Sequence, residues 1–158
     1  MGGVMVGKAV VPAELLTQIE AWVVRCYEDE FREVRPGRWW SARLTAMKGV
    51  PLFVAEARAK AFDHFAIPRD APGGDLADFV NFHKSGGVHM HTDAPGQRRI
   101  NVMVSKPEVG GNPFIGTKEI EVGAGDAWTF DCGAQSHGSV EMAGDRPRIV
   151  LSFGFKEA

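Results

Sequence analysis

The sequence predicts an α+β fold that is mainly β, in which short strands form a small sandwich or barrel and helices near the N-terminus pack on one sheet. Two observations support this prediction. Helix-like periodicity is concentrated in the first 65 residues, and strand-like runs separated by Gly, Pro, Asn or Asp dominate the rest. The chain also contains 19 glycines and 9 prolines, a turn-rich composition that suits short strands better than a helical bundle. We expect one domain over residues 1–158, because this length supports a single core and we find no repeat or linker.

The N-terminal third is expected to contain two helices and two strands. Residues 1–8 are interpreted as a first strand, and residues 39–47 as a second, between Pro-Gly and Gly-Val-Pro turns. Residues 12–27 are predicted to form an amphipathic helix with one apolar stripe. Residues 51–65 are predicted to form a second helix, with apolar residues at steps of four. The two stripes consist of Leu15, Ile19, Trp22, Val23 and Cys26, and of Phe53, Ala57, Ala61 and Phe65.

The second half is expected to be strand-rich. Residues 69–75 are predicted to form a loop because of their Pro, Gly and Asp content. Six strand-like runs follow, so that about eight strands are expected in all. These runs cover residues 76–83, 88–92, 99–105, 119–122, 127–131 and 148–155.

Composition excludes several classes of protein. A formal net charge of −2 provides no general attraction to phosphate backbones, so nucleic acid is an unlikely partner. The two cysteines, Cys26 and Cys132, form neither a disulfide framework nor a CxxC metal motif, which favours a reducing, cytoplasmic location. The N-terminus has no basic segment ahead of an apolar stretch, so we expect no secretory signal, and no apolar run is long enough to span a membrane.

His91, Asp93 and His137 are candidate metal ligands. His91 and Asp93 lie two residues apart, so on a strand both side chains would point to the same face. His137 lies in a turn-rich stretch after the strand predicted at 127–131. Two imidazoles and one carboxylate leave three positions of an Fe(II) ion open, as non-haem oxygenases require. A His-x-Asp triplet alone is weak evidence, and each residue also has an ordinary interpretation as a surface or loop polar residue.

Arg148 is a candidate anion-binding residue. It begins the apolar run 148–155, where a buried guanidinium would be costly unless an anion met it. Arginine can hold a carboxylate through two parallel hydrogen bonds, and Ser152, four residues later, would share its face and could add a hydroxyl donor. A surface ion pair is the alternative role for Arg148.

These residues belong to a longer pattern that resembles the Fe(II)/2-oxoglutarate-dependent oxygenase superfamily, and within it the prolyl-hydroxylase-like group. The resemblance covers residues 78–155, about half of the chain. It rests on FHKSGGVHMHTD at 82–93, RRINVMV at 98–104, Gly110-Gly111, GDAWTFD at 125–131, His137-Gly138 and RIVLSF at 148–153. The resemblance implies a double-stranded β-helix, a jelly-roll or cupin-like fold, with N-terminal supporting helices.

The resemblance also implies roles for individual residues. His91, Asp93 and His137 would bind iron, and Arg148 would pair with the C5 carboxylate of 2-oxoglutarate. Arg146 is a rival anchor, because its spacing from His137 also occurs in the family; Pro147 and the position of Ser152 favour Arg148. Other residues implied to contact the co-substrate or line its pocket are Asn81, where the group commonly has Tyr, together with Asn101, Ser105 and Ser152.

The activity implied by the resemblance is hydroxylation of an unactivated C–H bond, coupled to decarboxylation of 2-oxoglutarate to succinate. Fe(II), 2-oxoglutarate and O2 would be required, with ascorbate as a further candidate. Members that halogenate lack the carboxylate ligand, so Asp93 favours hydroxylation. A small molecule, a free amino acid or a peptide segment all remain open as substrate, and the oligomeric state and the biological pathway remain open too.

Three other functions are alternatives. A cupin-type metal protein would use His89 with His91, but the remaining cupin pattern is missing, and His89 and His83 are left without an assigned role. A catalytically silent binding protein of the same fold is disfavoured because every ligand is present. A nucleic-acid demethylase would usually carry a second arginine six residues after Arg148, where this chain has Gly154.

Overall fold

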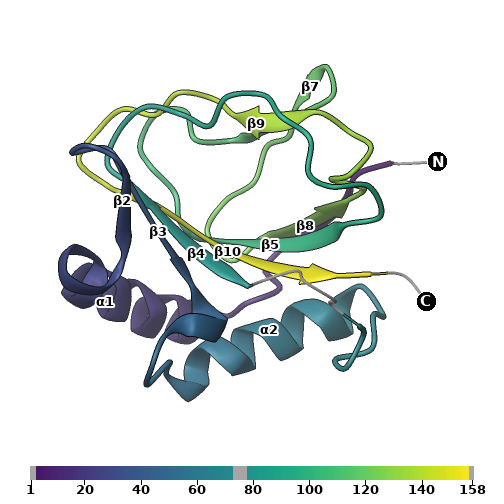
Figure 1. The fold of residues 1–158 in the computed structure, drawn as a ribbon, viewed down its shortest axis with the longest axis horizontal. Helices are drawn as coiled ribbons and strands as arrows, with labels where there is room; N and C mark the ends of the chain where they lie inside the picture. The colour runs from purple at the N-terminus through teal and green to yellow at the C-terminus, as the bar shows by residue number, and fades with distance from the viewer. Residues whose placement is uncertain (1–2, 73–77, 157–158) are drawn as a thin grey trace.

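Two helices cover one face of a large antiparallel sheet, and a small sheet lies across the other face (Figure 1). The structure is a computed structural model that describes residues 3–72 and 78–156. The helices are α1 (Ala13–Glu30), η1 (Leu44–Ala46, a 3-10 turn) and α2 (Leu52–His64). The strands are β1 (Met5–Gly7), β2 (Arg32–Arg35), β3 (Trp39–Arg43), β4 (Phe79–His83), β5 (Arg98–Ser105), β6 (Pro113–Ile115), β7 (Lys118–Glu119), β8 (Ala127–Phe130), β9 (His137–Ser139) and β10 (Arg148–Phe155).

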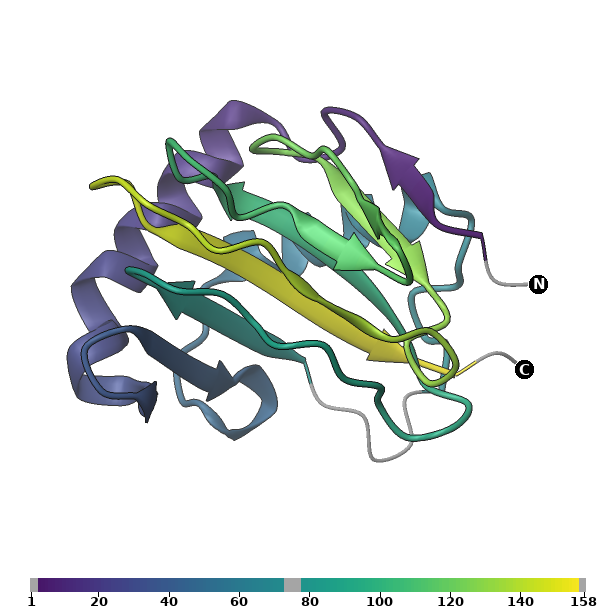
Figure 2. The ribbon, with the colours of Figure 1, turned by 90° about the horizontal axis from the view of Figure 1, so that it is seen from above.

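The large sheet has seven strands in the order β1-β8-β5-β10-β4-β3-β2, and the small sheet has three in the order β7-β6-β9. All strand pairs within both sheets are antiparallel. Figure 2 shows the long central strands β5 and β10 side by side, with the helices behind them. This arrangement confirms the predicted fold class, a mainly β double-stranded β-helix with N-terminal supporting helices.

Alternation along the central strands separates two packed layers. In β10, Ile149, Leu151 and Phe153 belong to the core between the large sheet and the helices. Arg148 and Ser152 occupy the alternate positions of the strand, and they point into the space between the two sheets, where they line a cavity. Every residue of β10 is therefore buried, as expected for a strand covered on both faces.

The two predicted helices form, and they differ in how well their buried faces follow the prediction. All five residues of the predicted stripe on α1 are buried. On α2, Ala57 and Ala61 are buried as predicted, but Phe53 and Phe65 are only partly buried, and Val54 and Phe62 take the central positions. A step of four overshoots the 3.6-residue turn, so the buried stripe drifts away from residues spaced at four.

The strand prediction is wrong in several places. Residues 88–92 form no regular strand; the isolated bridge between His91 and His137 and a hydrogen bond from Ser139 N to Val88 O connect this segment to β9. Short strands β2, β6 and β9 lack an alternating apolar pattern and were not predicted, and the strand expected at 119–122 is β7. The strand expected at 39–47 ends at Arg43. Parts of the predictions for 1–8, 69–75 and 76–83 lie outside the described residues.

Gly138 lets β9 lie close to the segment that carries His91. A Cβ on Gly138 would lie only 2.4 Å from the carbonyl oxygen of Val88. Ser139 donates its backbone N–H to the same carbonyl at 2.9 Å, so the two segments are in direct contact. Any side chain at position 138 would push them apart. Within the described ranges, no helix has the length and apolar character needed to cross a membrane.

Candidate active site

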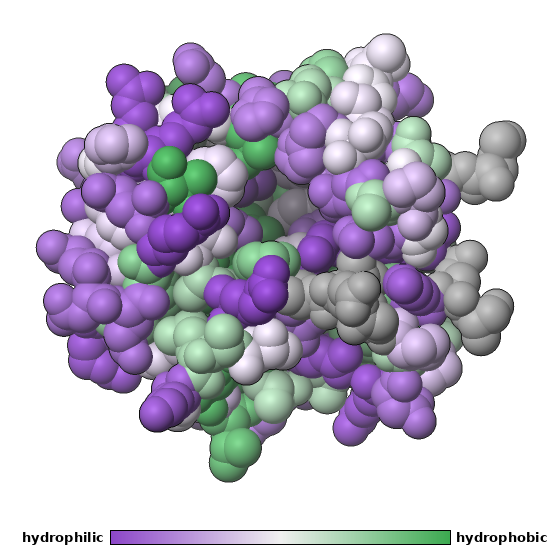
Figure 3. Space-filling model, viewed as in Figure 1, coloured by the Kyte–Doolittle hydropathy of each residue, from purple (hydrophilic) through white to green (hydrophobic). Residues whose placement is uncertain are grey.

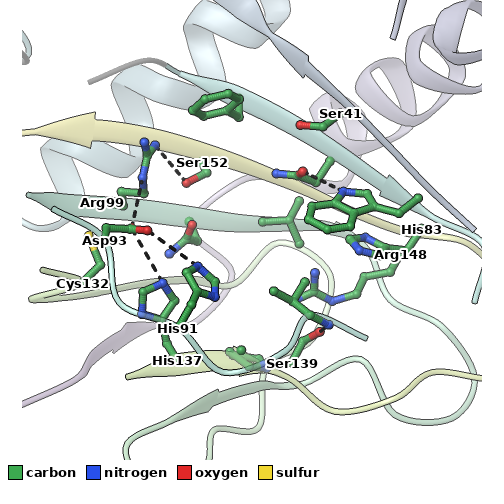
Figure 4. A pocket seen from close by; sticks show the side chains of 18 of the residues that line it. Ser41, His83, His91, Asp93, Arg99, Cys132, His137, Ser139, Arg148 and Ser152 are labelled. Carbon is green, nitrogen blue, oxygen red and sulfur yellow. Dashed lines mark hydrogen bonds and ion pairs between the residues drawn. The ribbon is translucent and has the colours of Figure 1, made fainter. Parts of the chain in front are cut away.

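A cavity of about 350 Å³ lies between the large sheet and the small sheet. The space-filling view in Figure 3 shows a hollow in this region of a mostly hydrophilic face. Its walls come from alternate residues of β2, β3, β4, β5, β8 and β10 on one side, and from β6, β9 and the segment 88–93 on the other. The cavity is thus built by both sheets, and Figure 4 shows the polar side chains that enter it.

His91, Asp93 and His137 converge at one end of this cavity (Figure 4). One possible ligand atom from each residue lies within 4.8 Å of those of the other two. Asp93 Oδ1 is 3.6 Å from His91 Nε2, and Asp93 Oδ2 is 3.7 Å from His137 Nε2. These separations are too long for good hydrogen bonds, and they are compatible with one ion between the three groups.

The backbone orients both imidazole rings. His91 Nδ1 lies 2.9 Å from the carbonyl oxygen of His89, and His137 Nδ1 lies 2.9 Å from that of Gln135. A carbonyl can only accept, so each Nδ1 carries the proton and each Nε2 is left with its lone pair. Burial lowers the pKa of His137, which keeps that imidazole in the neutral form that metals require. The donor set therefore fits a divalent metal.

The ligands come together by loop contacts, where the sequence predicted a strand. His91 and His137 exchange backbone hydrogen bonds of 2.9 and 2.8 Å, and Asp93 N donates to Cys132 O at 2.9 Å. The segment 91–93 is thereby fixed between β9 and Cys132, which lies two residues after the end of β8. The sequence predicted from strand alternation that His91 and Asp93 point to one face; the structure brings the two side chains together without a regular strand.

Two further side chains surround Asp93, and the sequence gave no direct indication of either role. Arg99 Nε lies 3.7 Å from Asp93 Oδ2, and Arg99 Nη1 donates to Ser152 Oγ at 3.4 Å. Burial, and then the Asp93 carboxylate, raise the pKa of the Cys132 thiol to about 12, so the thiol is neutral. Arg99 lies two residues before Asn101 on β5, so strand alternation could have predicted that Arg99 points to the same face as Asn101.

Arg148 is buried in the cavity wall away from the three candidate metal ligands (Figure 4). Its side chain is 6% exposed, and its Nε donates to Gly111 O at 2.7 Å. Burial lowers the pKa of the guanidinium to about 10, so it remains a cation at neutral pH. Among the described residues, no carboxylate lies within ion-pair distance of it. This is the unpaired buried cation that the sequence predicted, and Ser152 lines the same cavity.

Arg146 points elsewhere. Its Nη2 lies 3.6 Å from Glu20 Oε2 on α1, and its backbone N–H donates to the Glu108 carboxylate. The side chain is 53% exposed, and it is absent from the described residues that line the cavity. Of the two candidate arginines, Arg148 is the one that faces the cavity.

The other predicted site residues divide into two groups. Asn81 and Asn101 line the cavity, and Asn81 Oδ1 accepts a hydrogen bond of 3.0 Å from Trp39 Nε1. Ser105 does not line it, which corrects the prediction. A register shift between Ile149 and Val150 places Ser105 opposite Ile149, and its hydroxyl donates to Pro147 O at 2.7 Å.

The two histidines without an assigned role also differ. His83 is 2% exposed and lines the cavity, and neither ring nitrogen has a hydrogen-bond partner in the described structure. His89 is exposed and is not part of the group that could hold a metal. A cupin-type site that uses His89 as a ligand therefore finds no support in this geometry.

Solved structures share this fold over nearly the whole chain. A prolyl-4-hydroxylase from Pseudomonas putida aligns with a TM-score of 0.71 and 15% identity, covering 100% of this chain and 94% of that one. HygX from Streptomyces hygroscopicus, with nickel and 2-oxoglutarate bound, gives a TM-score of 0.75 and 12% identity over 99% of this chain and 84% of its own. The α-ketoglutarate-dependent epimerase SnoN from nogalamycin biosynthesis gives 0.72 and 14% over 97% and 77%.

The similarity is one of structure. No protein-family model matches the sequence, and no curated protein matches it. At 12–15% identity the structural alignments show the fold alone. They confirm the expected resemblance to Fe(II)/2-oxoglutarate oxygenases at that level, and the site's own geometry must support any statement about chemistry.

Proposed function

We propose that this protein is an Fe(II)- and 2-oxoglutarate-dependent dioxygenase that hydroxylates a C–H bond of a small molecule, amino acid or peptide. One observation supports this function above all others. A cavity contains a His91-Asp93-His137 group whose Nε2 and carboxylate atoms could bind a metal, and its wall also contains Arg148, a buried cation for which the described residues provide no carboxylate partner. A metal and the far end of a dicarboxylic acid are the groups that would satisfy these two features together.

In this proposal His91, Asp93 and His137 hold Fe(II) and leave its other positions to exogenous ligands. The backbone carbonyls that accept from the two Nδ1–H groups keep the rings oriented and make Nε2 a better donor. Arg99, 3.7 Å from Asp93, partly offsets the carboxylate's negative charge.

Arg148 holds the C5 carboxylate of 2-oxoglutarate. Because its Nε–H already donates a hydrogen bond to Gly111 O, its two terminal nitrogens are the groups that would bind the carboxylate. Ser152, Asn81 and Asn101 line the cavity and can donate or accept hydrogen bonds along the co-substrate. Ser105 has no part in this site, because its hydroxyl is donated to a backbone carbonyl in the described structure.

Fe(II) and 2-oxoglutarate, when bound, would activate O2 as the oxidant, with one oxygen atom used to convert 2-oxoglutarate to succinate and CO2 and the other available to the substrate. The chain contributes orientation and exclusion of water. Apolar and aromatic residues that pack together away from the helices, among them Ile115, Trp128 and Phe130, line the cavity beside the polar groups. They keep the reacting C–H bond in a partly dry environment, where a reactive oxidant is protected from side reactions.

The substrate remains a proposal at the level of class. HygX has been solved with hygromycin B bound, and SnoN with nogalamycin RO, so we include small molecules among the proposed substrate classes. Trp39 lines the cavity, whereas Trp40 packs in the core between the sheet and the helices. Trp39 is therefore available to a substrate, and Trp40 is not.

A succinate-release screen tests this function directly. The protein is incubated with Fe(II), 2-oxoglutarate, ascorbate and O2, with panels of amino acids, short peptides and small hydroxylated metabolites. We expect succinate formation to rise above the substrate-free level with one class, and mass spectrometry to show addition of one oxygen to that substrate. Loss of the rise in the Asp93→Ala variant assigns it to this site. Product with no added oxygen would contradict hydroxylation.

A further inference from the structure

His83 lies beside Arg148 on the cavity side of the large sheet. In the pairing of β4 with β10, His83 is directly opposite Arg148, and in the pairing of β4 with β3 it is directly opposite Trp39. Side chains directly opposite in antiparallel strands lie on the same face about 4.5–5.5 Å apart at Cβ. Trp39, His83 and Arg148 therefore form a transverse row across three strands, and all three line the cavity.

The environment of His83 leaves it without a hydrogen-bond partner. The ring stacks on Trp39 with centroids 4.9 Å apart and planes 17° apart, which fixes its orientation. The side chain is 2% exposed, yet neither Nδ1 nor Nε2 is hydrogen-bonded in the described structure. A buried polar group without a partner costs free energy, so such a group in a cavity wall is available to hydrogen-bond a bound ligand.

His83 is neutral in this environment. Burial, then the positive charges of Arg148 on β10 and Arg35 on β2, lower the pKa of the imidazole to about 3. A neutral imidazole carries one N–H donor and one acceptor nitrogen. It can therefore donate a hydrogen bond to an anion without adding a third positive charge next to the two arginines.

We propose that His83 donates its N–H to the distal carboxylate of the 2-oxo dicarboxylic acid that Arg148 holds, and so helps to select a dicarboxylate over a monocarboxylate. This inference rests on the proposed function, because it names a second contact for the same co-substrate. The stack on Trp39 holds the ring plane, Arg148 supplies the charge, and His83 adds a directional donor.

The test compares two acids that differ only in the distal carboxylate. 2-Oxoglutarate and 2-oxobutyrate are titrated by calorimetry into protein loaded with Zn(II), for wild type, His83→Phe, His83→Gln and His89→Phe. Phe keeps the aromatic stack and removes the N–H, whereas Gln retains an N–H donor. His89→Phe is the matched control, because the His89 ring is exposed and outside the described cavity lining, and the substitution keeps the backbone carbonyl that accepts from His91 Nδ1.

We expect His83→Phe to bind 2-oxoglutarate about tenfold or more weakly, since a hydrogen bond to a charged group is lost. Affinity for 2-oxobutyrate and for Zn(II) should be unchanged. His83→Gln should recover most of the affinity, and His89→Phe should match wild type. Equal affinity of wild type and His83→Phe for 2-oxoglutarate would overturn the assignment of His83. Failure of wild type to bind 2-oxoglutarate would overturn the proposed function instead.

A second measurement needs no folded variant at this position. Proton NMR of histidine-labelled, Zn(II)-loaded wild type should gain one slowly exchanging imidazole N–H signal when 2-oxoglutarate is added, and no such signal with 2-oxobutyrate. Its nuclear Overhauser contacts to the indole protons of the stacked Trp39 assign it to His83. A titration that saturates with 2-oxoglutarate and yields no new imidazole signal would contradict the proposal.

Discussion

His91 and His137 exchange a reciprocal pair of backbone hydrogen bonds, His91 N to His137 O at 2.9 Å and His137 N to His91 O at 2.8 Å. The same two residues carry the imidazoles of the candidate metal site, with ring centroids 4.3 Å apart. The distance between two ligands far apart in the sequence is thus set by main-chain pairing. A change that separates the two segments should weaken metal binding without touching any ligand.

Gly138→Val makes that change. Its Cβ would meet Val88 O at 2.4 Å, so β9 must move away from the segment that carries His91. We expect an unfolding free energy lower by about 1–3 kcal/mol, as for other overpacked sites, together with weaker Co(II) binding measured by visible absorption. Gly123→Ala is the control, because its Cβ would meet only Asp126 Oδ2, at an ordinary 3.7 Å. Unchanged Co(II) affinity in Gly138→Val would contradict the role of this contact.

Arg148→Met and Arg146→Met separate the two candidate anchors. Arg148 is buried in the cavity wall, whereas Arg146 is half exposed and paired with Glu20. We expect Arg148→Met to weaken 2-oxoglutarate binding by about tenfold to hundredfold, because a charged hydrogen-bonding partner is lost, and to leave Zn(II) affinity unchanged. Calorimetry measures both constants. If Arg146→Met produced the loss and Arg148→Met did not, Arg146 and not Arg148 would be the residue that binds 2-oxoglutarate.

His83 should make the metal-free protein less stable in acid. Burial, then Arg148 and Arg35, lower its pKa in the folded state to about 3, below the ordinary value of 6.5. Between these two values the unfolded chain binds a proton that the folded chain does not. Stability should therefore fall as pH falls below about 6.5, by up to about 1.4 kcal/mol per pH unit from this group alone. Urea unfolding from pH 7 to 5 should show a smaller loss in His83→Phe; an equal loss would contradict this origin.

Asp126 should stabilise the turn before β8. Its carboxylate accepts from Ala9 N and Gly123 N, both at 2.8 Å, and from Lys8 Nζ at 3.1 Å. Burial raises its pKa, but these donors outweigh burial and the net pKa is lowered. Asp126→Asn should cost about 1–3 kcal/mol at pH 7, measured by urea unfolding. The cost should shrink as pH falls through the lowered pKa; a cost independent of pH down to 3 would show that the charge is unimportant.

Much of the fold follows from local periodicity. Alternation along 148–155 was enough to predict that Arg148 and Ser152 share a face, and β10 places both in the cavity lining. Ser105 could not be excluded in this way. Its position depends on a register shift between Ile149 and Val150, which is set by pairing between two strands far apart in the sequence.

The same limit applies to the residues around the site. Arg99 and Cys132 matter to the site because they lie beside Asp93, and His83 matters because strand pairing places it between Trp39 and Arg148. Arg99 follows Asp93 by six residues, but Cys132 and His83 lie far in the sequence from the residues beside them. Spacing predicted the three candidate ligands, and only the three-dimensional arrangement identifies the groups that surround them.

The proposed function requires that this cavity binds Fe(II) and 2-oxoglutarate together. Anaerobic addition of both to the wild-type protein, followed by visible absorption, tests it most directly. We predict a weak charge-transfer band that His91→Ala and Asp93→Ala abolish and that His89→Ala, which removes an exposed ring outside the site, retains. A folded wild-type protein with no band and no 2-oxoglutarate binding would contradict the account.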